Sequence, residues 1–344
     1  MSKRVTMCQI GQIIGVSTVT VFKALGGKDG VSNSMRAQIV EKAREMGYEY
    51  AANARRSVNN GKQDVGILVP DRFFGDSSFY AALYKRSVQW LAEASCYGIL
   101  EILYAADEEE GIMPAMIRTG KVDALIVMGQ VSAAYMQALL NTRLPCVFLD
   151  FYTEQADVTY VVSDSLYGAY LLTNHLVHMG HREIGFVGDI HATSSILDRY
   201  LGYYKSLLQN GIPLRPEWVL PDRNENGLLK EVTLPEKMPT AFVCNCDETA
   251  YLFMDQLKRR GYHIPKDISI VGFDDFLFAR LCNPPLTTFR VDQDVIAMAA
   301  VKALVKKMHD NSSHTGRIVV SGHMVYRNSV MSRHGALEAE LMNI

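Results

Sequence analysis

Apolar residues recur every three or four positions in the first segments of the chain. The first segment runs up to Ile14, and Gly15 then favours the left-handed backbone of a tight turn. Ser17 can cap a second helix whose Val21 and Ala24 face one side. Two short helices joined by a glycine turn are typical of a helix-turn-helix, whose second helix fits the major groove of DNA. An ordinary helical hairpin is the alternative for so short a motif.

A third helix and a linker follow these two helices. Ser32 can cap a helix whose apolar stripe includes Ile39, so residues 1–49 are predicted to form a small three-helix domain. Residues 50–63 permit a helix as far as Val58 and then break at Asn-Asn-Gly. We expect this segment to be a linker or a hinge helix that forms only against a partner.

From residue 64 the pattern changes to short apolar runs separated by helical stretches. Eight runs are predicted to be strands: 65–69, 99–104, 124–128, 146–149, 159–162, 184–187, 241–244 and 268–273. Strands that alternate with helices indicate a parallel sheet covered on both faces. There are too many strands for one small sheet, so we expect two α/β halves, with ligands beyond the carboxyl ends of the strands.

Net charge changes the picture only when it is divided along the chain. The whole chain carries −2, but its first 62 residues hold ten Lys and Arg against four Asp and Glu, a charge of +6. The remainder therefore carries −8. A small basic domain on a larger acidic body is typical of a protein whose head binds a polyanion and whose body stays off it.

Length and composition predict a cytoplasmic protein of about two or three domains. No apolar run approaches the length of a membrane span, and the N-terminus leads into no signal-peptide core. The six cysteines are scattered, which is typical of reduced thiols rather than of a disulfide framework. A solute-binding protein of the transport kind should have a secretion signal and no basic head, so this alternative is disfavoured.

Catalytic and metal-binding chemistry have little support in the sequence. An enzyme on an α/β scaffold is a weak alternative, because no nucleophile–base pair or phosphate loop stands out. His175, His178 and His181 are spaced by three and could form a metal ledge, although a structural role is the better interpretation. Adjacent residues on an extended chain point to opposite faces, so we expect one of Asp274 and Asp275 to face a ligand and the other to be structural. No cofactor or metal is predicted.

Short motifs occur in order along nearly the whole chain. In the first part they are Val5-Thr6, Gly15-Val16-Ser17, Thr20-Val21, Val31-Ser32, Gly47-Tyr48, Ala54-Arg55, Val65-Gly66 and Val69-Pro70-Asp71. In the body they are Asp164, Gly168-Ala169, Leu176, Gly180-His181-Arg182, Arg199, Gly202-Tyr203, Val271-Gly272-Phe273-Asp274-Asp275, Pro284-Pro285-Leu286-Thr287-Thr288, Val325, Arg327 and Ser329. Together they resemble the LacI/GalR family of transcriptional repressors.

The resemblance implies an α/β fold class: an N-terminal helix-turn-helix head and a body like a type I periplasmic binding protein, with two doubly wound parallel-sheet subdomains. The body would span 64–330, with the chain crossing between subdomains near 163, 291 and 321, and 331–344 would form a tail. The resemblance also implies a repressor that binds a pseudo-palindromic operator in double-stranded DNA as a homodimer, with a tetramer as the alternative. A small effector in the cleft would control it, with a sugar predicted and a purine as the alternative.

The chain departs from the family pattern at several positions. Phe22 stands where the family usually has a small Ser in the second helix. Ser57 falls on the family leucine that wedges into the minor groove, and Val58 lies beside it. Cys246 replaces the family Asn before Asp247. We therefore expect an unusual operator and an unusual effector.

The predicted DNA contacts lie in the head and the hinge. Thr18 and Val19 are expected to face base edges, and Lys23 to reach a base or a phosphate, because they lie on the exposed side of the second helix. The hydroxyls expected to hold phosphates are those of Thr6, Ser17, Thr20 and Ser32. The hinge candidates are Asn53, Arg55, Ser57 and Val58, with Val58 or Ser57 as the minor-groove wedge.

The predicted effector site combines charged and aromatic side chains. Asp164, Arg199 and Asp274 match family effector positions, and such groups can hold a polyhydroxylated ring by charge-assisted hydrogen bonds. The candidates for covering the ring faces are Phe73, Phe79 and Tyr152, with Phe276 a weaker one. Asp71 and Cys246 complete the predicted site.

Overall fold

The computed structural model describes residues 5–25, 30–46, 48, 63–74, 79–155, 157–225, 227–310 and 316–333. The predicted hinge contacts Asn53, Arg55, Ser57 and Val58 lie outside the described residues, as does the tail from residue 334.

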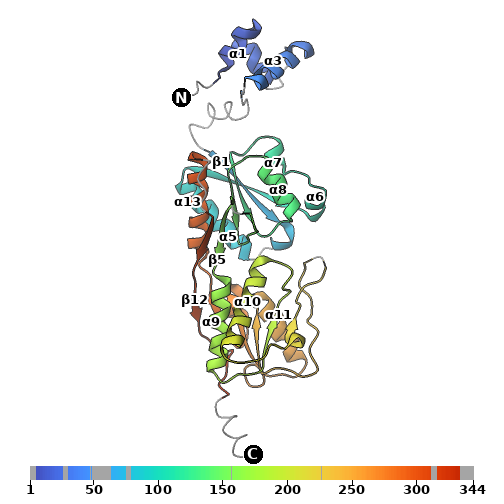
Figure 1. The fold of residues 1–344 in the computed structure, drawn as a ribbon, viewed down its shortest axis with the longest axis vertical. Coiled ribbons are helices and arrows are strands. Elements are labelled where there is room, and N and C mark those ends of the chain that lie inside the picture. The colour runs from blue at the N-terminus through green and yellow to red at the C-terminus, as the bar shows by residue number, and fades with distance from the viewer. Residues whose placement is uncertain are drawn as a thin grey trace, which may run out of the picture.

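Three helices form the head: α1 (Met7–Ile14), α2 (Thr18–Leu25) and α3 (Asn33–Glu45) (Figure 1). Each begins where the sequence offers a hydroxyl cap, because the first amides of a helix need acceptors. The Ser17 hydroxyl accepts from the Thr20 amide at 3.1 Å, and the Ser32 hydroxyl accepts from the Met35 amide at 3.3 Å. The three helices pack around a small core that is centred on Ile10.

The turn between α1 and α2 depends on two glycines. Gly15 has a φ of 78°, which ends α1 in the left-handed region. Gly11 lets the two helices approach closely, since a Cβ on it would lie 2.7 Å from the Val16 carbonyl oxygen. The helices meet at 105°, within the range of about 90–120° that is typical of a helix-turn-helix.

The body contains two six-stranded sheets, one in each subdomain (Figure 1). The N-subdomain sheet has the order β11-β5-β4-β3-β1-β2, and the C-subdomain sheet has the order β12-β10-β9-β8-β6-β7. The first sheet contains β1 (Gln63–Pro70), β2 (Cys96–Leu103), β3 (Ala124–Met128), β4 (Cys146–Leu149), β5 (Thr159–Ser163) and β11 (Arg317–Val320). The second contains β6 (Ile184–Val187), β7 (Val219–Leu220), β8 (Ala241–Cys244), β9 (Ser269–Asp274), β10 (Thr287–Arg290) and β12 (His323–Val325). The described strand pairs are parallel except β10–β12, which is antiparallel.

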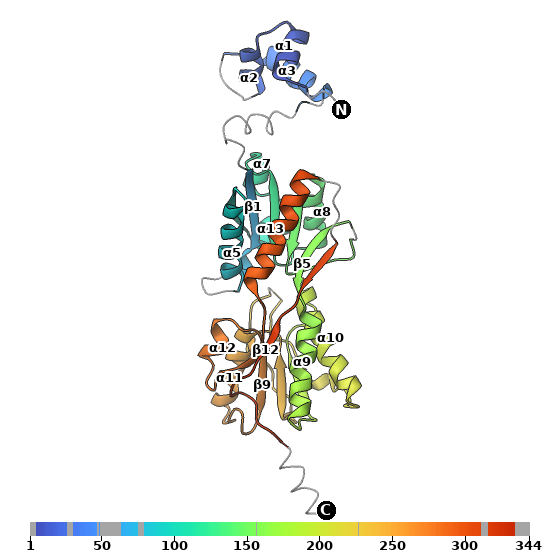
Figure 2. The same cartoon turned by 90° about the vertical axis from the view of Figure 1, so that its left-hand side faces the viewer.

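Helices cover both faces of each sheet, as Figure 2 shows. The N-subdomain helices are α5 (Phe79–Glu93), α6 (Ala105–Glu109), α7 (Ala115–Arg118), α8 (Ala133–Asn141) and α13 (Gln293–His309), with a short 3-10 turn, η1 (Asp71–Phe73). The C-subdomain helices are α9 (Ser165–His178), α10 (Ser194–Gln209), α11 (Asp247–Arg259) and α12 (Leu277–Leu281), with a second turn, η2 (Pro216–Trp218). Successive residues of β1 serve opposite faces: Ile67 packs in the core that includes α5 and α13, and Leu68 packs in the core that includes α8.

The chain passes between the two subdomains three times. It leaves the first sheet after β5, returns after β10 to form α13 against β4 and β5, and leaves again between β11 and β12. These passages fall close to residues 164, 291 and 321. The two subdomains are therefore joined by three short segments.

Among the described residues, no single helix is long and apolar enough to cross a membrane. Among these residues, only α1 and α2 taken together have the length and apolar composition of a membrane span, and the two are bent by 105°. Their apolar residues Ile10 and Val21 are fully buried in the core of the head.

Candidate functional sites

The side of α2 that is predicted to read DNA is exposed. Val19 is 62% exposed, and Ser17, Thr18 and Lys23 are also at the surface. An apolar residue so exposed is consistent with a contact surface. The Arg36 guanidinium donates to the carbonyl oxygen of Ala24 at 3.0 Å and so satisfies the C-terminal end of α2.

Three of the four hydroxyls predicted to hold phosphates, those of Thr6, Ser17 and Ser32, serve as helix caps. Thr6 makes a capping box with Gln9: its hydroxyl accepts from the Gln9 amide at 3.3 Å, and its amide donates to Gln9 Oε1 at 2.9 Å. The Ser17 and Thr20 hydroxyls lie 2.8 Å apart. These hydroxyls therefore mark the starts of exposed helices, where amide groups and the helix dipole favour an anion.

A cavity of about 450 Å³ lies in the cleft between the subdomains, and we call it the cleft cavity. From the N-subdomain it is lined by Arg72, Phe73, Phe79, Tyr80 and Asp150. From the C-subdomain it is lined by Thr193, Ser195, Ile196, Arg199, Arg223, Gly227, Leu228, Leu229, Asn245, Cys246, Asp247, Glu248, Asp274, Phe276 and Phe278. Many of these residues lie beyond the carboxyl ends of β1, β4, β8 and β9, which is where α/β folds bind ligands.

Arg199 and Asp274 form an ion pair in the wall of the cavity. An Arg199 Nη lies 3.4 Å from Asp274 Oδ1, a second donates to the Asn245 carbonyl oxygen at 2.7 Å, and the guanidinium stacks 4.0 Å from the centre of the Phe273 ring. Burial raises the pKa of Asp274 to about 7 even though the Arg199 charge acts to lower it. This pair can donate to and accept from one ligand group.

Asp150 supplies a second carboxylate from the opposite subdomain. It is 7% exposed, and its Oδ2 accepts from the Tyr80 hydroxyl at 2.6 Å. Burial raises the pKa of Asp150, and it also raises that of Tyr80, which the negative charge of Asp150 raises further. Asp150 has a φ of 68° and Asp274 a φ of 110°, so both strand ends hold a backbone conformation that is rare outside glycine.

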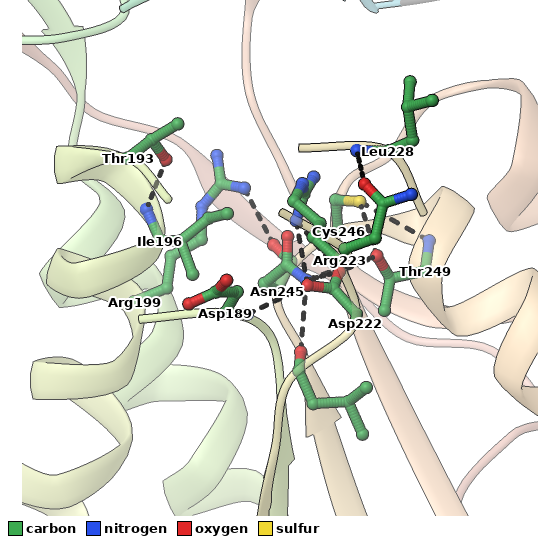
Figure 3. Close-up of polar contacts among 12 residues, drawn as sticks. Asp189, Thr193, Ile196, Arg199, Asp222, Arg223, Leu228, Asn245, Cys246 and Thr249 are labelled. Atoms are coloured by element: carbon green, nitrogen blue, oxygen red, sulfur yellow. Dashed lines mark hydrogen bonds and ion pairs between the residues drawn. The ribbon is translucent and has the colours of Figure 1, made fainter. Parts of the chain in front are cut away.

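A buried network around Asp222 fixes the far wall of the cavity (Figure 3). Asp222 is 1% exposed and accepts from the Asp189 amide, from Asn245 Nδ2 at 2.6 Å and from the Thr249 hydroxyl at 2.7 Å. Arg223 donates to both Asp222 oxygens at 2.9 and 3.0 Å. Because Asn245 Nδ2 faces two acceptors, Asp222 and the Val187 carbonyl oxygen, the amide group of Asn245 can point in only one direction.

Cys246 caps the N-terminus of α11 at the edge of this network. Its Sγ accepts from the Thr249 amide at 3.4 Å, so the thiol takes the capping role that a short polar side chain usually has. Burial raises the pKa of Cys246 to about 11, with a further contribution from the charge of Asp274. The thiol is therefore neutral at physiological pH and acts as a small, weakly polar part of the wall.

Adjacent Asp274 and Asp275 have separate environments. The Asp275 side chain is fully buried and forms ion pairs with Arg290, which ends β10, and with Arg327, which follows β12. Asp274 alone lines the cavity. Asp275 is therefore the structural carboxylate of the two, and that Asp274 faces a ligand stays a prediction.

Six predicted effector residues line the cavity: Phe73, Phe79, Arg199, Cys246, Asp274 and the weaker candidate Phe276. Three others do not. Asp71 begins η1 with an exposed side chain, and Asp164 is taken up by capping α9, where it accepts from the Tyr167 amide at 3.4 Å. The Tyr152 hydroxyl instead donates to Asp198 on α10 at 2.7 Å and so bridges the two subdomains.

Several cavity residues were not predicted. Asp150 directly follows β4, and Asn245 directly follows β8. Searching for polar residues at the carboxyl end of every predicted strand would have found both. Arg223 and Leu228 come from an irregular loop, where no pattern of apolar residues marks a position.

The spaced histidines have structural contacts. His181 is 1% exposed and hydrogen-bonds to the Thr240 hydroxyl and to the Met331 carbonyl oxygen, and burial lowers its pKa to about 4. His175 lies edge-on to Tyr326, with 4.9 Å between the ring centres. Within the described part of the chain, no group of three His, Cys, Asp or Glu side chains is placed to hold a metal ion.

Comparison with known proteins gives consistent matches. Residues 173–330 match the model of a periplasmic binding protein-like domain. The HTH-type transcriptional repressor PurR of Pasteurella multocida is 25% identical over 342 residues, covering 95% of this chain and 99% of that protein. The relatives of this kind are transcriptional repressors rather than enzymes.

Two solved structures share the fold. The lac repressor dimer bound to operator and the anti-inducer ONPF has a TM-score of 0.65 and 19% identity, covering 96% of this chain and 100% of that one. A LacI family transcriptional regulator from Enterococcus faecium with bound ribose has a TM-score of 0.65 and 22% identity, covering 78% of this chain and 99% of that one.

A helix-turn-helix head joined to a two-sheet body with a ligand-sized cavity defines a class: transcriptional regulators with a periplasmic-binding-protein-like body. The matches along nearly the whole chain agree with that class. The chain resembles the transcriptional regulators of the LacI family along nearly its whole length.

Proposed function

We propose that this regulator is a cytoplasmic repressor that binds a pseudo-palindromic operator as a homodimer and is controlled by a small molecule in the cleft cavity. The observation that carries the proposal is the lining of the cavity by both subdomains. A ligand that contacts both would favour one relative pose of the subdomains. Through the dimer, that pose would set the spacing of the two heads and so the affinity for DNA.

The DNA half of the proposal rests on α2. Its exposed Thr18 and Val19 are available to base edges, and Lys23 is available to a base or a phosphate. The capped helix starts at Thr6, Ser17 and Ser32 would lie against phosphates. The lac repressor dimer bound to operator, whose fold is similar, is consistent with a dimer on DNA.

The effector half favours a polyhydroxylated ring. Asp150, Arg199 and Asp274 together offer charged acceptors and donors, which suit the hydroxyl groups of a sugar. Phe73, Phe79, Phe276 and Phe278 provide apolar faces for the ring. A similar fold holds ribose in the regulator from Enterococcus faecium. A purine stacked on these phenylalanines is the second candidate.

The test uses the purified full chain and operator DNA selected from a random pool. Sugars and nucleobases are screened by thermal shift, and those that bind are tested for their effect on operator affinity. Arg199→Ala should abolish the effector response, because the ligand loses its guanidinium partner, and should leave operator binding without effector largely intact. The matched control is Arg215→Ala, which removes a surface arginine whose side chain is 49% exposed.

Two results would contradict the proposal. One is an unchanged effector response in Arg199→Ala, which would locate the effector outside the cleft cavity. The other is turnover of a bound sugar with no change in DNA binding, which would make the protein an enzyme.

A further inference from the structure

The described side chains of the cleft cavity carry more acid than base. The carboxylates in its lining are those of Asp150, Asp247, Glu248 and Asp274. The guanidinium groups in its lining are those of Arg72, Arg199 and Arg223. The cavity therefore has four acidic groups against three basic ones before their partners are considered.

Two of the three guanidinium groups already form ion pairs with carboxylates that do not line the cavity. Arg72 donates to Glu108 at 2.7 Å, and the Glu108 side chain is only 7% exposed. Arg223 pairs with the buried Asp222. With these two partners included, six acids face three bases, a formal charge of −3 when all are ionised. Of the three, Arg199 alone offers its charge to a ligand, and Asp274 shares that charge.

The helix termini at the cavity oppose this negative charge only in part. α10 and α11 both begin there, and each N-terminus carries roughly half a positive charge. The α10 amides are already engaged: that of Ser194 donates to Gln130 Oε1 at 2.8 Å, and that of Ile196 donates to the Thr193 hydroxyl at 3.2 Å. A total of about one positive charge does not offset a formal −3.

The hydrogen-bonding atoms left over are mainly acceptors. Asn245 Oδ1 is buried and has no partner among the described residues, and its orientation is fixed because Nδ2 donates to the Val187 carbonyl oxygen and to Asp222. Glu248, likewise, has no hydrogen-bond or ion-pair partner in the described part of the chain. The buried Nε of Arg199 is a donor without a partner among the same residues. The cavity thus needs a ligand with several donors and at least one acceptor.

We propose that the effector is a polyhydroxylated molecule that carries a protonated amine, such as an amino sugar. This inference rests on the proposed function, because it takes the cleft cavity as the effector site. The ammonium group would lie among the carboxylates of Asp150, Glu248 and Asp274 and donate to them, and a ligand hydroxyl would accept from Arg199. An added phosphate or carboxylate group would meet like charge and bind poorly.

The ionisation of these carboxyl groups depends on whether a cation is bound among them. Burial raises the pKa of Asp150, of Glu248 and of Asp274, so the empty cavity disfavours their anions. A cation placed among them would favour the ionised forms.

The test compares sugars that differ by one group, on the full chain at pH 6, where an ordinary amine is protonated. The probes are glucosamine and glucose, galactosamine and galactose, mannosamine and mannose, with glucose 6-phosphate as an anionic probe. We expect at least one amino sugar to bind about tenfold or more tightly than its neutral parent by titration calorimetry. The proposal is overturned if every neutral parent binds as tightly as its amine, if the phosphate binds tightest, or if no amino sugar binds.

Glu248→Gln then tests the source of the preference. It should lower the ratio of amine to parent affinity about fivefold, because the ammonium group loses a charged partner and the neutral parent does not. Asp255→Asn is the matched control: it removes one charge from the same helix, at a side chain that is 63% exposed, and should leave the ratio unchanged. An equal loss for amine and parent in Glu248→Gln would overturn the proposal.

Failure of this inference is distinguishable from failure of the proposed function. If a neutral sugar or a purine binds and Arg199→Ala abolishes the response, the cavity remains the effector site and only the charge of the effector is wrong. If the response survives in Arg199→Ala, the proposed site itself is wrong.

Discussion

Among single residues of the cavity, Asp274 shows how burial and nearby charges change the pKa of a carboxyl group. Its side chain is 11% exposed, and charged groups approach it from several elements: Arg199 on α10, Asp150 after β4, and Asp247 and Glu248 on α11. The single nearby guanidinium does not offset the loss of water, so the pKa rises to about 7.

A raised pKa makes stability depend on pH. The folded protein holds the Asp274 proton more tightly than the unfolded chain, so this stabilisation is full below about pH 4 and is lost as the pH rises through about 7. Asn cannot ionise. The free energy of unfolding of Asp274→Asn, minus that of the unchanged protein, should therefore rise by about 1–3 kcal/mol between pH 5 and pH 8.

Urea unfolding of the full chain at several pH values measures this difference. Asp255→Asn, on the exposed side of α11, should give a difference that is flat with pH. A flat difference for Asp274→Asn as well would mean that the carboxylate keeps an ordinary pKa.

The polar residues of the cavity were only partly predictable from the sequence. Arg199 and Asp274 were found through family motifs, and Phe73 and Phe79 as candidate ring covers. Asp164 and Tyr152 were predicted to bind the effector as well, yet Asp164 caps a helix and Tyr152 donates to Asp198 across the cleft. Which way such a side chain turns depends on its neighbours in space, and the order of residues does not contain that information.

At the scale of elements, strands with continuous apolar runs were predicted and four others were missed. β7 has two residues, β10 is Thr-Thr-Phe-Arg, and β11 and β12 are short, partly exposed edge strands. β7, β11 and β12 lie at sheet edges, which face water along one side and need no apolar run. β10 lies between β9 and β12, but its two threonines interrupt the apolar run by which a buried strand is recognised. The two-sheet architecture was nevertheless predictable, because most of the buried inner strands were found.

The element that should read DNA is α2, and Thr18 is its most direct test. Thr18→Ala should cost about 1–3 kcal/mol at one base position and relax the preference there, because a hydroxyl or methyl contact to a base edge is lost. Binding to a library of operator variants measures this. Gln12→Ala, at an exposed position on α1, is the control and should leave the preference unchanged.

Affinity for random DNA discriminates between two roles of Thr18. If Thr18→Ala weakens binding to random DNA as much as binding to the operator, the side chain contacts the backbone and does not read bases.

At the scale of the whole molecule, the relative pose of the subdomains is held by contacts outside the cavity. The Tyr152 hydroxyl donates to Asp198 at 2.7 Å, and the Ser194 amide donates to Gln130 Oε1 at 2.8 Å. Both bonds join one subdomain to the other. The pose therefore has its own stabilisation, which a ligand adds to or works against.

Tyr152→Phe should shift this equilibrium without touching ligand or DNA. Losing one such bond costs about 1 kcal/mol, or about fivefold in the ratio of two poses. Affinities for effector and for operator should both change by up to about that factor, since both depend on the pose. Titrations of each measure the change, with Tyr104→Phe, a tyrosine that is 57% exposed, as the control. Unchanged affinities would mean that the hydroxyl bond does not distinguish the poses.

The three passages of the chain between subdomains also determine when each part can be completed during synthesis. The head ends near residue 48, but the first sheet lacks its edge strand β11 and its covering helix α13 until residue 320 has been made. At about 5–20 residues per second, roughly 10–30 s separate the end of β5 from the end of β11. During this interval the face that carries Ile67 lacks α13. A chain that is cut short in this interval would therefore have the DNA-binding head and lack a finished effector cleft.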